Sequence, residues 1–269
     1  MTGQDGASQA PAEVPGLRVE QQGQVLTLVF DRPRQHNAMT YAMYDGLEAA
    51  CERADADDSV RVLVLHGAGE RAFVSGTDIT QFEGITSGED GLAYEARITR
   101  VVTRLEDVTV PTVAVVRGYC IGGGLAIATA CDLRVAGRSA TFGVPIARTV
   151  GNCLAMPVYA MLVAQIGPAR TLDMLLRARL LSAEEAASAG FVAQLVDDDA
   201  LDAAAEEVVQ ALLRHAPLTM WATKQAVARL RRAGLPDGDD LVRRVYGSED
   251  FARAVRAFSA KEANTWTGR

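Results

Sequence analysis

Apolar strands alternate with amphipathic segments over the first two thirds of the chain, and this pattern predicts an α/β protein. The stretch LRVEQQGQVLTLVF alternates apolar and polar positions around the turn QQGQ, which is typical of two short strands. In the next segment, Met43, Leu47 and Cys51 recur at helical spacing, and Thr40 can cap that helix. Strands that alternate with helices favour a largely parallel, buried sheet. The predicted strands cover residues 17–30 as a pair, 61–67 and 109–118, and the predicted helices cover residues 40–57 and 91–107.

The second part of the chain is predominantly helical. Helical patterns prevail after Ala155 and occupy almost all of the sequence after Leu201, with a last helix from about Asp239. We therefore expect an α/β core over residues 17–200 and a helical C-terminal region over residues 201–269 that serves oligomerisation.

Composition and charge exclude several classes of partner. A net charge of −7 and a pI near 5.1 argue against binding to a nucleic-acid backbone. Residues 1–16 are small and polar, with no basic start and no apolar run, so they predict a flexible tail rather than a signal peptide or anchor. No segment has the roughly 20 uncharged apolar residues of a membrane span. The four cysteines lack CxxC or metal-ligand spacing, which predicts reduced, buried thiols in a cytoplasmic protein and no metal site.

Three consecutive glycines, Gly122 to Gly124, run into the uncharged segment LAIATAC. They could serve tight packing between a strand and a helix, a dinucleotide site, or an oxyanion site at a helix N-terminus. The dinucleotide fingerprint GxGxxG is incomplete, because its third glycine is missing after Gly122 and Gly124. The following helix is apolar on every side, so its N-terminal amides should point into a buried environment of low dielectric.

A second glycine loop, GAGERAFVSGTDI at residues 67–79, also follows a buried strand. Two such loops can aim two backbone N–H donors at a single oxygen atom. One loop alone is a weak signal, whereas the pair predicts an oxyanion hole.

These glycine segments, together with DRPRQHNAMT, ATFGVPIA and IGPARTLDMLLRARLLSAEEAASAGFV, resemble the enoyl-CoA hydratase/isomerase family, also called the crotonase superfamily. The resemblance runs from about residue 17 to the end of the chain. It implies a crotonase-like spiral of ββα units with a C-terminal helical region, assembled as a homotrimer or a dimer of trimers. It also implies an acyl-CoA substrate, with coenzyme A present as part of the thioester and no separate cofactor.

The resemblance assigns roles to individual residues. The amides of Thr77 and Gly123 would form an oxyanion hole that polarises the thioester carbonyl and stabilises the enolate formed from it. The segment PRQHNAM would line the CoA channel, and Lys261 or Arg269 could meet a phosphate. The residues implied in substrate or CoA binding are Arg34, His36, Ala38, Gly76, Asp78, Ile79 and Gly122.

The sequence departs from the family pattern at two positions that matter for the chemistry. Family hydratases carry one glutamate two residues after the glycine triplet and another after the proline of FGxPE, and here Ala126 and Ile146 occupy these positions. Hydration needs one group to deprotonate the water and another to protonate the α-carbon, and neither Ala nor Ile titrates. Efficient hydration is therefore not expected, whereas isomerisation, decarboxylation and thioester or C–C cleavage stay open.

Other residues could move protons in place of the missing glutamates. Asn152 and Cys153 follow in a loop expected near the pocket, and His66 ends a strand just before the first glycine loop. Each also has a purely structural interpretation, Cys153 as a small apolar residue that opens a helix. The main hypothesis is an acyl-CoA-processing enzyme. The alternative is a non-catalytic acyl-CoA-binding or scaffold protein, which explains Ala126 and Ile146 but leaves the intact glycine loops without a purpose.

Overall fold

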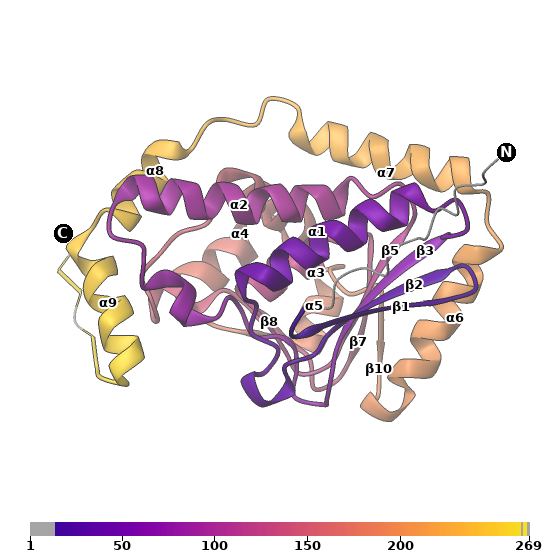
Figure 1. Ribbon diagram of the computed structural model, residues 1–269, viewed down its shortest axis with the longest axis horizontal. Coiled ribbons are helices and arrows are strands. Elements are labelled where there is room, and N and C mark those ends of the chain that lie inside the picture. Colours follow the sequence, from indigo (N-terminus) through magenta and orange to yellow (C-terminus); the bar gives the residue numbers. More distant parts are fainter. Residues whose placement is uncertain (1–13, 265, 268–269) are drawn as a thin grey trace, which may run out of the picture.

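The computed structural model describes residues 14–264, 266 and 267. The tail expected over residues 1–16 therefore lies almost wholly outside the described residues, as does Arg269. The described part forms two sheets surrounded by helices (Figure 1). Within it, no helix is both long and apolar enough to cross a membrane.

Two sheets form the centre of the fold. The larger sheet has six strands in the order β1-β2-β3-β5-β7-β10, and only its β1–β2 pair is antiparallel. The smaller sheet has the order β4-β6-β8-β9, and only its β8–β9 pair is antiparallel. The strands are β1 (Leu17–Gln22), β2 (Val25–Phe30), β3 (Val62–Gly67), β4 (Ala72–Val74), β5 (Thr112–Val116), β6 (Tyr119–Ile121), β7 (Leu133–Gly137), β8 (Thr141–Gly143), β9 (Leu181–Ser182) and β10 (Gln194–Val196).

A repeated unit of two strands and a helix generates both sheets. In the units β3-β4-α2, β5-β6-α3 and β7-β8-α4, the first strand joins the larger sheet and the second strand joins the smaller one. The chain therefore advances as a spiral of ββα units, and the predicted α/β class is confirmed. The three helices are α2 (Gly88–Glu106), α3 (Gly123–Ala130) and α4 (Met156–Leu176).

Most of the remaining helices begin where the sequence supplies a capping side chain or a proline. Helix α1 starts behind Thr40, whose hydroxyl accepts a hydrogen bond from the Met43 amide at 3.3 Å, as predicted. The single last helix expected from about Asp239 is wrong, because the chain breaks at Gly247 and Ser248 caps a new helix. These helices are α1 (Tyr41–Ala56), α5 (Ala183–Ser188), α6 (Leu201–Leu213), α7 (Pro217–Arg232), α8 (Asp239–Tyr246) and α9 (Glu249–Ala260), with short 3-10 turns η1 (Pro33–Gln35), η2 (Ile79–Phe82), η3 (Pro145–Ala147) and η4 (Asp198–Ala200).

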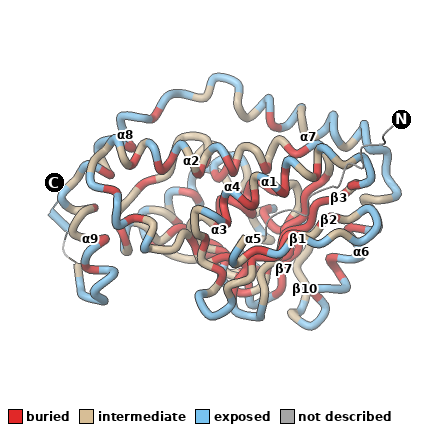
Figure 2. The backbone as a smooth tube through the Cα atoms, in the orientation of Figure 1, coloured by how far each residue is buried: buried red, intermediate tan, exposed pale blue. Residues whose placement is uncertain are grey.

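Both faces of the larger sheet are covered. One face contributes to the main core with α1 to α4, and the other packs against α6, which Figure 1 shows flanking β10. Buried positions therefore concentrate in the central strands and α3, whereas α7 is mostly exposed (Figure 2). All four cysteines are unpaired and buried in this core, as expected. The second core cluster joins Val62, Val64, Val113, Val115 and Val135 of the sheet to Leu201, Ala204, Ala205 and Val209 of α6.

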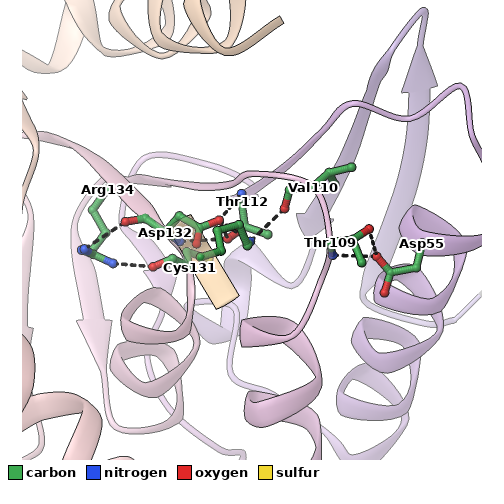
Figure 3. Close-up of polar contacts among 8 residues, drawn as sticks. Asp55, Thr109, Val110, Thr112, Cys131, Asp132 and Arg134 are labelled. Carbon is green, nitrogen blue, oxygen red and sulfur yellow. Dashed lines mark hydrogen bonds and ion pairs between the residues drawn. The ribbon is translucent and has the colours of Figure 1, made fainter. Parts of the chain in front are cut away.

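A buried polar cluster next to α3 ties the C-terminal helices to the sheet. The Asp132 carboxylate accepts hydrogen bonds from the Thr112 amide and hydroxyl, and Arg134 donates to the backbone carbonyls of Cys131 and Asp132 (Figure 3). Lys224 of α7 forms an ion pair with the same carboxylate, and its side chain is only 8% exposed. Because a buried charge is tolerated only with partners, this ion pair anchors α7 next to Thr112 at the start of β5.

Candidate active site

Two glycine loops from neighbouring units touch each other. Gly76 has a φ of 118° and Gly122 a φ of 56°, values that residues with side chains rarely adopt. A carbon added at Gly122 would lie 3.5 Å from the Cα of Gly76, so the two backbones are in contact. The first loop is fixed by hydrogen bonds from the Met39 amide to the Gly76 carbonyl and from the Asp78 amide to the Met39 carbonyl, both 2.8 Å.

Each loop presents a backbone amide to one pocket. Thr77 follows the first glycine and Gly123 opens helix α3, and neither amide donates a hydrogen bond to any residue that the structure describes. Helix α3 is buried from Gly124 to Ala130, so its N-terminal partial charge is not screened by solvent. Both amides border a pocket of about 170 Å³. The arrangement suits an oxygen that gains negative charge.

Tyrosine side chains support the first loop. The hydroxyls of Tyr44 and Tyr94 each lie 2.9 Å from the Thr77 hydroxyl, so three hydroxyls form one hydrogen-bonded chain. Burial raises the pKa of both tyrosines above the usual value, which keeps them protonated. A carbon added at Gly123 would lie 2.3 Å from the Tyr44 hydroxyl, and one at Gly124 would lie 2.2 Å from the Val74 carbonyl oxygen. Gly123 and Gly124 leave no room for side chains, because Tyr44 and strand β4 approach them closely.

The rest of the pocket is mostly apolar. Ala126 and Ile146, the positions at which family hydratases carry glutamates, both border it. Of the residues expected around the substrate, Gly76, Ile79, Gly122 and Asn152 line it as well. The remaining lining residues come from the loop after β4, η2, α2, β6, the segment after β8, α4 and α9, namely Ser75, Phe82, Tyr94, Glu95, Ile98, Ile121, Val144, Pro145, Thr149, Val150, Leu154, Val158 and Phe258.

Glu95 of α2 supplies a carboxyl group to the pocket, and the sequence analysis did not identify it. Its side chain is buried, with an exposure of 5%, and its two oxygens accept hydrogen bonds from the Tyr246 hydroxyl at 2.5 Å and the Ala155 amide at 2.9 Å. Burial raises the pKa of Glu95 to about 7, although both hydrogen bonds act to lower it. The one sequence signal was its position three residues before Ile98 on the buried face of an otherwise polar helix.

A short network continues from Glu95 into the loop before α4. The Asn152 amide nitrogen donates to the Tyr246 hydroxyl at 3.1 Å, while its oxygen, Oδ1, has no partner among the described residues. Cys153, which was expected near the pocket, does not line it: its thiol points toward the Leu241 carbonyl at 3.9 Å. Burial raises the pKa of Cys153 to about 12, so this thiol is protonated at neutral pH.

His66 also lies away from the pocket. It sits at the end of β3, and its ring nitrogen Nδ1 is 3.3 Å from the Gly67 carbonyl. Its place in the fold therefore gives no support to the interpretation as an acid or base.

The segment expected to line the CoA channel, residues 33–39, contains η1 and the turn that follows it. Arg34 is exposed on η1, and His36 follows it with its ring packed edge-on against Tyr119. Arg32 donates at 2.6 Å to the Ala38 carbonyl and at 2.9 Å to Asp78, which caps η2.

Asp78 has a structural role within this loop. Burial opposes its charge, but hydrogen bonds from Thr80 and Arg32 outweigh this effect and lower its pKa. Lys261, the other expected phosphate contact among the described residues, is exposed at the end of α9.

Comparison with known proteins relates this arrangement to a family. A family model described as enoyl-CoA hydratase/isomerase matches residues 20–269. A probable enoyl-CoA hydratase of Rhizobium meliloti (strain 1021) is 34% identical over 252 residues, which cover 91% of this chain and 95% of that protein. The 2,3-dehydroadipyl-CoA hydratase of Escherichia coli (strain K12) is 30% identical over 259 residues, which cover 94% and 99%.

Solved structures agree with the family match. An enoyl-CoA hydratase/carnithine racemase from Magnetospirillum magneticum superposes with a TM-score of 0.78 at 32% identity, covering 94% of this chain and 96% of that one. A methylmalonyl-CoA decarboxylase in complex with 2-nitronate-propionyl-CoA has a TM-score of 0.85 at 22% identity, covering 94% and 98%, which shows the shared fold alone. The spiral of ββα units, the paired glycine loops and a family match over nearly the whole chain lead to one conclusion: the chain belongs to the enoyl-CoA hydratase/isomerase family, and its fold is the crotonase fold.

Proposed function

We propose that this protein is an enzyme that binds an acyl-CoA and stabilises the enolate of its thioester between the amides of Thr77 and Gly123. The observation that carries this proposal is a pair of amides that have no acceptor among the described residues, supplied by two touching loops and bordering one pocket. Preorganised N–H donors of this kind gain strength where water is excluded. The relatives named above support a CoA thioester as the substrate class, because one is a 2,3-dehydroadipyl-CoA hydratase.

We further propose that efficient hydration is not the reaction. Ala126 and Ile146 border the pocket without a titratable group, and Glu95 is its only carboxyl group among the described residues. Addition of water needs groups that handle both the water and the α-carbon. These features favour reactions that need the oxyanion hole and a single acid–base group, such as isomerisation or another conversion through the enolate. A protein that only binds acyl-CoA is the alternative, and the loss of both glutamates favours it.

We also propose that the protein is a homotrimer or a dimer of trimers in the cytoplasm, with CoA present only within the substrate. Large exposed apolar side chains on α7 support an assembly, since Leu218, Val227 and Leu230 are each more than 60% exposed. The four unpaired cysteines support a reducing compartment.

A pair of double variants tests the oxyanion hole. The Tyr44 hydroxyl leaves no room for a side chain at Gly123, so both variants carry Tyr44→Phe, which removes that oxygen and leaves the next tyrosine atom at 3.6 Å. Gly123→Pro then removes the amide donor at the first helical position, where proline is tolerated, and Gly123→Ala keeps it. Both members carry a Cβ at this position, and the pair differs in the N–H group, which the proline ring replaces.

The readout is the absorption band of bound cinnamoyl-CoA, which moves to longer wavelength when its carbonyl is polarised. We expect the red shift in the wild type and in the double variant with Gly123→Ala. The double variant with Gly123→Pro should lose the red shift, and its turnover should fall by about 10²–10³-fold. Melting curves with and without the ligand check folding and binding. An equal red shift in both double variants would refute the assignment of the Gly123 amide.

A further inference from the structure

We propose that Glu95 is the acid–base residue of this pocket, and that it moves a proton between the α- and γ-carbons of a β,γ-unsaturated acyl-CoA. This inference rests on the proposed function, because the intermediate needs the oxyanion hole. It assigns the proton transfer to helix α2, away from the two positions at which family hydratases carry glutamates.

The position of Glu95 is fixed from two directions. Its carboxyl group borders the same pocket as Thr77 and Gly123. Tyr246 of α8 donates to one oxygen and the Ala155 amide to the other, so the group is held at both ends. A carboxylate has about four lone-pair positions, and these two bonds leave one on each oxygen for a substrate proton.

No cation neutralises Glu95 within the described part of the chain. The titratable groups that face it are neutral near pH 7, since burial raises the pKa of each one above its usual value. They are Tyr44 on α1, Tyr94 on α2, Cys153 before α4, Tyr159 on α4 and Tyr246 on α8. Desolvation without a countercharge leaves the Glu95 pKa at about 7, so the carboxylate and the carboxylic acid are both populated at neutral pH.

One carboxyl group suffices for a shift of a double bond. The Glu95 carboxylate takes a proton from the α-carbon, and the electron pair of the broken C–H bond enters a dienolate whose charge rests on the thioester oxygen. The thioester carbonyl then re-forms, the double bond moves between the α- and β-carbons, and the γ-carbon takes the proton back from Glu95. The step consumes no water, oxidant or second acid, which matches a pocket with one carboxyl group.

The test uses 3-hexenoyl-CoA and follows the conjugated thioester of 2-hexenoyl-CoA by its absorbance. We expect the wild type to form this product and Glu95→Gln to lose about 10²–10⁴-fold in kcat. Glu89→Gln is the matched control, because Glu89 lies on the same helix, is exposed and does not border this pocket. A Glu95→Gln variant with the wild-type rate would overturn the inference.

Two further measurements separate the possible outcomes. Bound cinnamoyl-CoA should keep its red shift in Glu95→Gln, because the amides of Thr77 and Gly123 are untouched. A wild type that shows the red shift but forms no product refutes the role of Glu95 and leaves the proposed function standing, whereas absence of both refutes the proposed function.

The pH profile separates an acid–base role from a merely structural one. In the wild type, kcat/KM should rise with pH through about 7 as Glu95 loses its proton. Tyr246→Phe removes a hydrogen bond that lowers the Glu95 pKa, so the midpoint should move to higher pH. A midpoint that stays in place would contradict the assignment.

Discussion

The Glu95 carboxyl group should make the stability of the protein depend on pH in an unusual direction. Desolvation raises its pKa from 4.5 to about 7, so between these values the folded protein holds a proton that the unfolded chain releases. The stabilisation from this proton is complete below the unfolded pKa and is lost as the pH rises through the folded pKa. The loss corresponds to about 3 kcal/mol in the free energy of unfolding.

Replacing Glu95 by Gln should remove this pH dependence. The amide is uncharged and similar in size, its oxygen can still accept from the Ala155 amide, and its nitrogen can donate to the Tyr246 hydroxyl oxygen. We expect Glu95→Gln to be more stable than the wild type by about 3 kcal/mol near pH 8 and equally stable near pH 4, measured by urea unfolding. Glu89→Gln should show no such difference. Equal stability of Glu95→Gln and wild type near pH 8 would show that burial of the ionised Glu95 side chain does not destabilise the protein.

Some of the candidate site residues carry signals that are local in the sequence. Thr77 and Gly123 each stand directly after a glycine in a recognisable loop, and the fold brings both to one pocket. Glu95 gave only a weak signal, because its environment comes from Tyr246 and Ala155, far along the chain. The position of His66 could not be foreseen for the same reason, because its distance from the pocket depends on how the strands pack.

At the scale of elements, α8 approaches α2 unusually closely. A carbon added at Gly91 of α2 would lie 2.2 Å from the Tyr246 side chain, and one at Gly88 would lie 2.4 Å from the Arg243 carbonyl oxygen. These two glycines let α8 bring Tyr246 to Glu95. The contact is therefore part of the candidate site, because it brings the Tyr246 hydroxyl to the Glu95 carboxyl group.

Gly91→Ala should push α8 away from α2. Alanine normally favours a helix over glycine by about 1 kcal/mol, so any loss of stability here comes from the clash. We expect a net destabilisation of about 1–3 kcal/mol in urea unfolding. Gly84→Ala is the control, because a carbon at Gly84 meets no atom within 4 Å. Similar stabilities of the two variants would show that the approach of α8 can relax.

The element boundaries show how far local patterns reach. Thr40 marked the start of α1 correctly, since a cap acts on the amides of its own first turn. The break between α8 and α9 was missed, although Ser248 followed by Glu249 is a cap signal with an acidic first turn. The helical pattern continues across this break, and packing of Phe251 against Tyr246 and Phe82 determines where the chain turns.

At the scale of the whole molecule, the exposed apolar side chains of α7 predict self-association. Leu218, Val227 and Leu230 are exposed, while Lys224 on the same helix is buried against Asp132. We expect sedimentation equilibrium to give the mass of three or six chains. The double variant Val227→Glu, Leu230→Glu should lower that mass if α7 contributes to the interface. A wild-type monomer at micromolar concentration would contradict the proposed assembly.

The α/β class could be foreseen from the alternation of strands and helices, and the ββα spiral from the family resemblance alone. The pairing of strands into two sheets could not, because β4, β6, β8 and β9 are only two or three residues long and carry little pattern of their own. β4, β6 and β8 each follow a longer strand of the larger sheet, and the pairing of those longer strands brings the short ones together.

The supply of Tyr246 by α8 has an evolutionary consequence. The amides that would bind the thioester oxygen belong to the central units of the fold, whereas the hydroxyl that holds Glu95 belongs to the C-terminal helices. Substitutions near the end of the gene can therefore retune or abolish proton transfer while the thioester-binding loops stay under their own selection. One inherited scaffold can in this way give rise to lineages that share a ligand and differ in the reaction they perform on it.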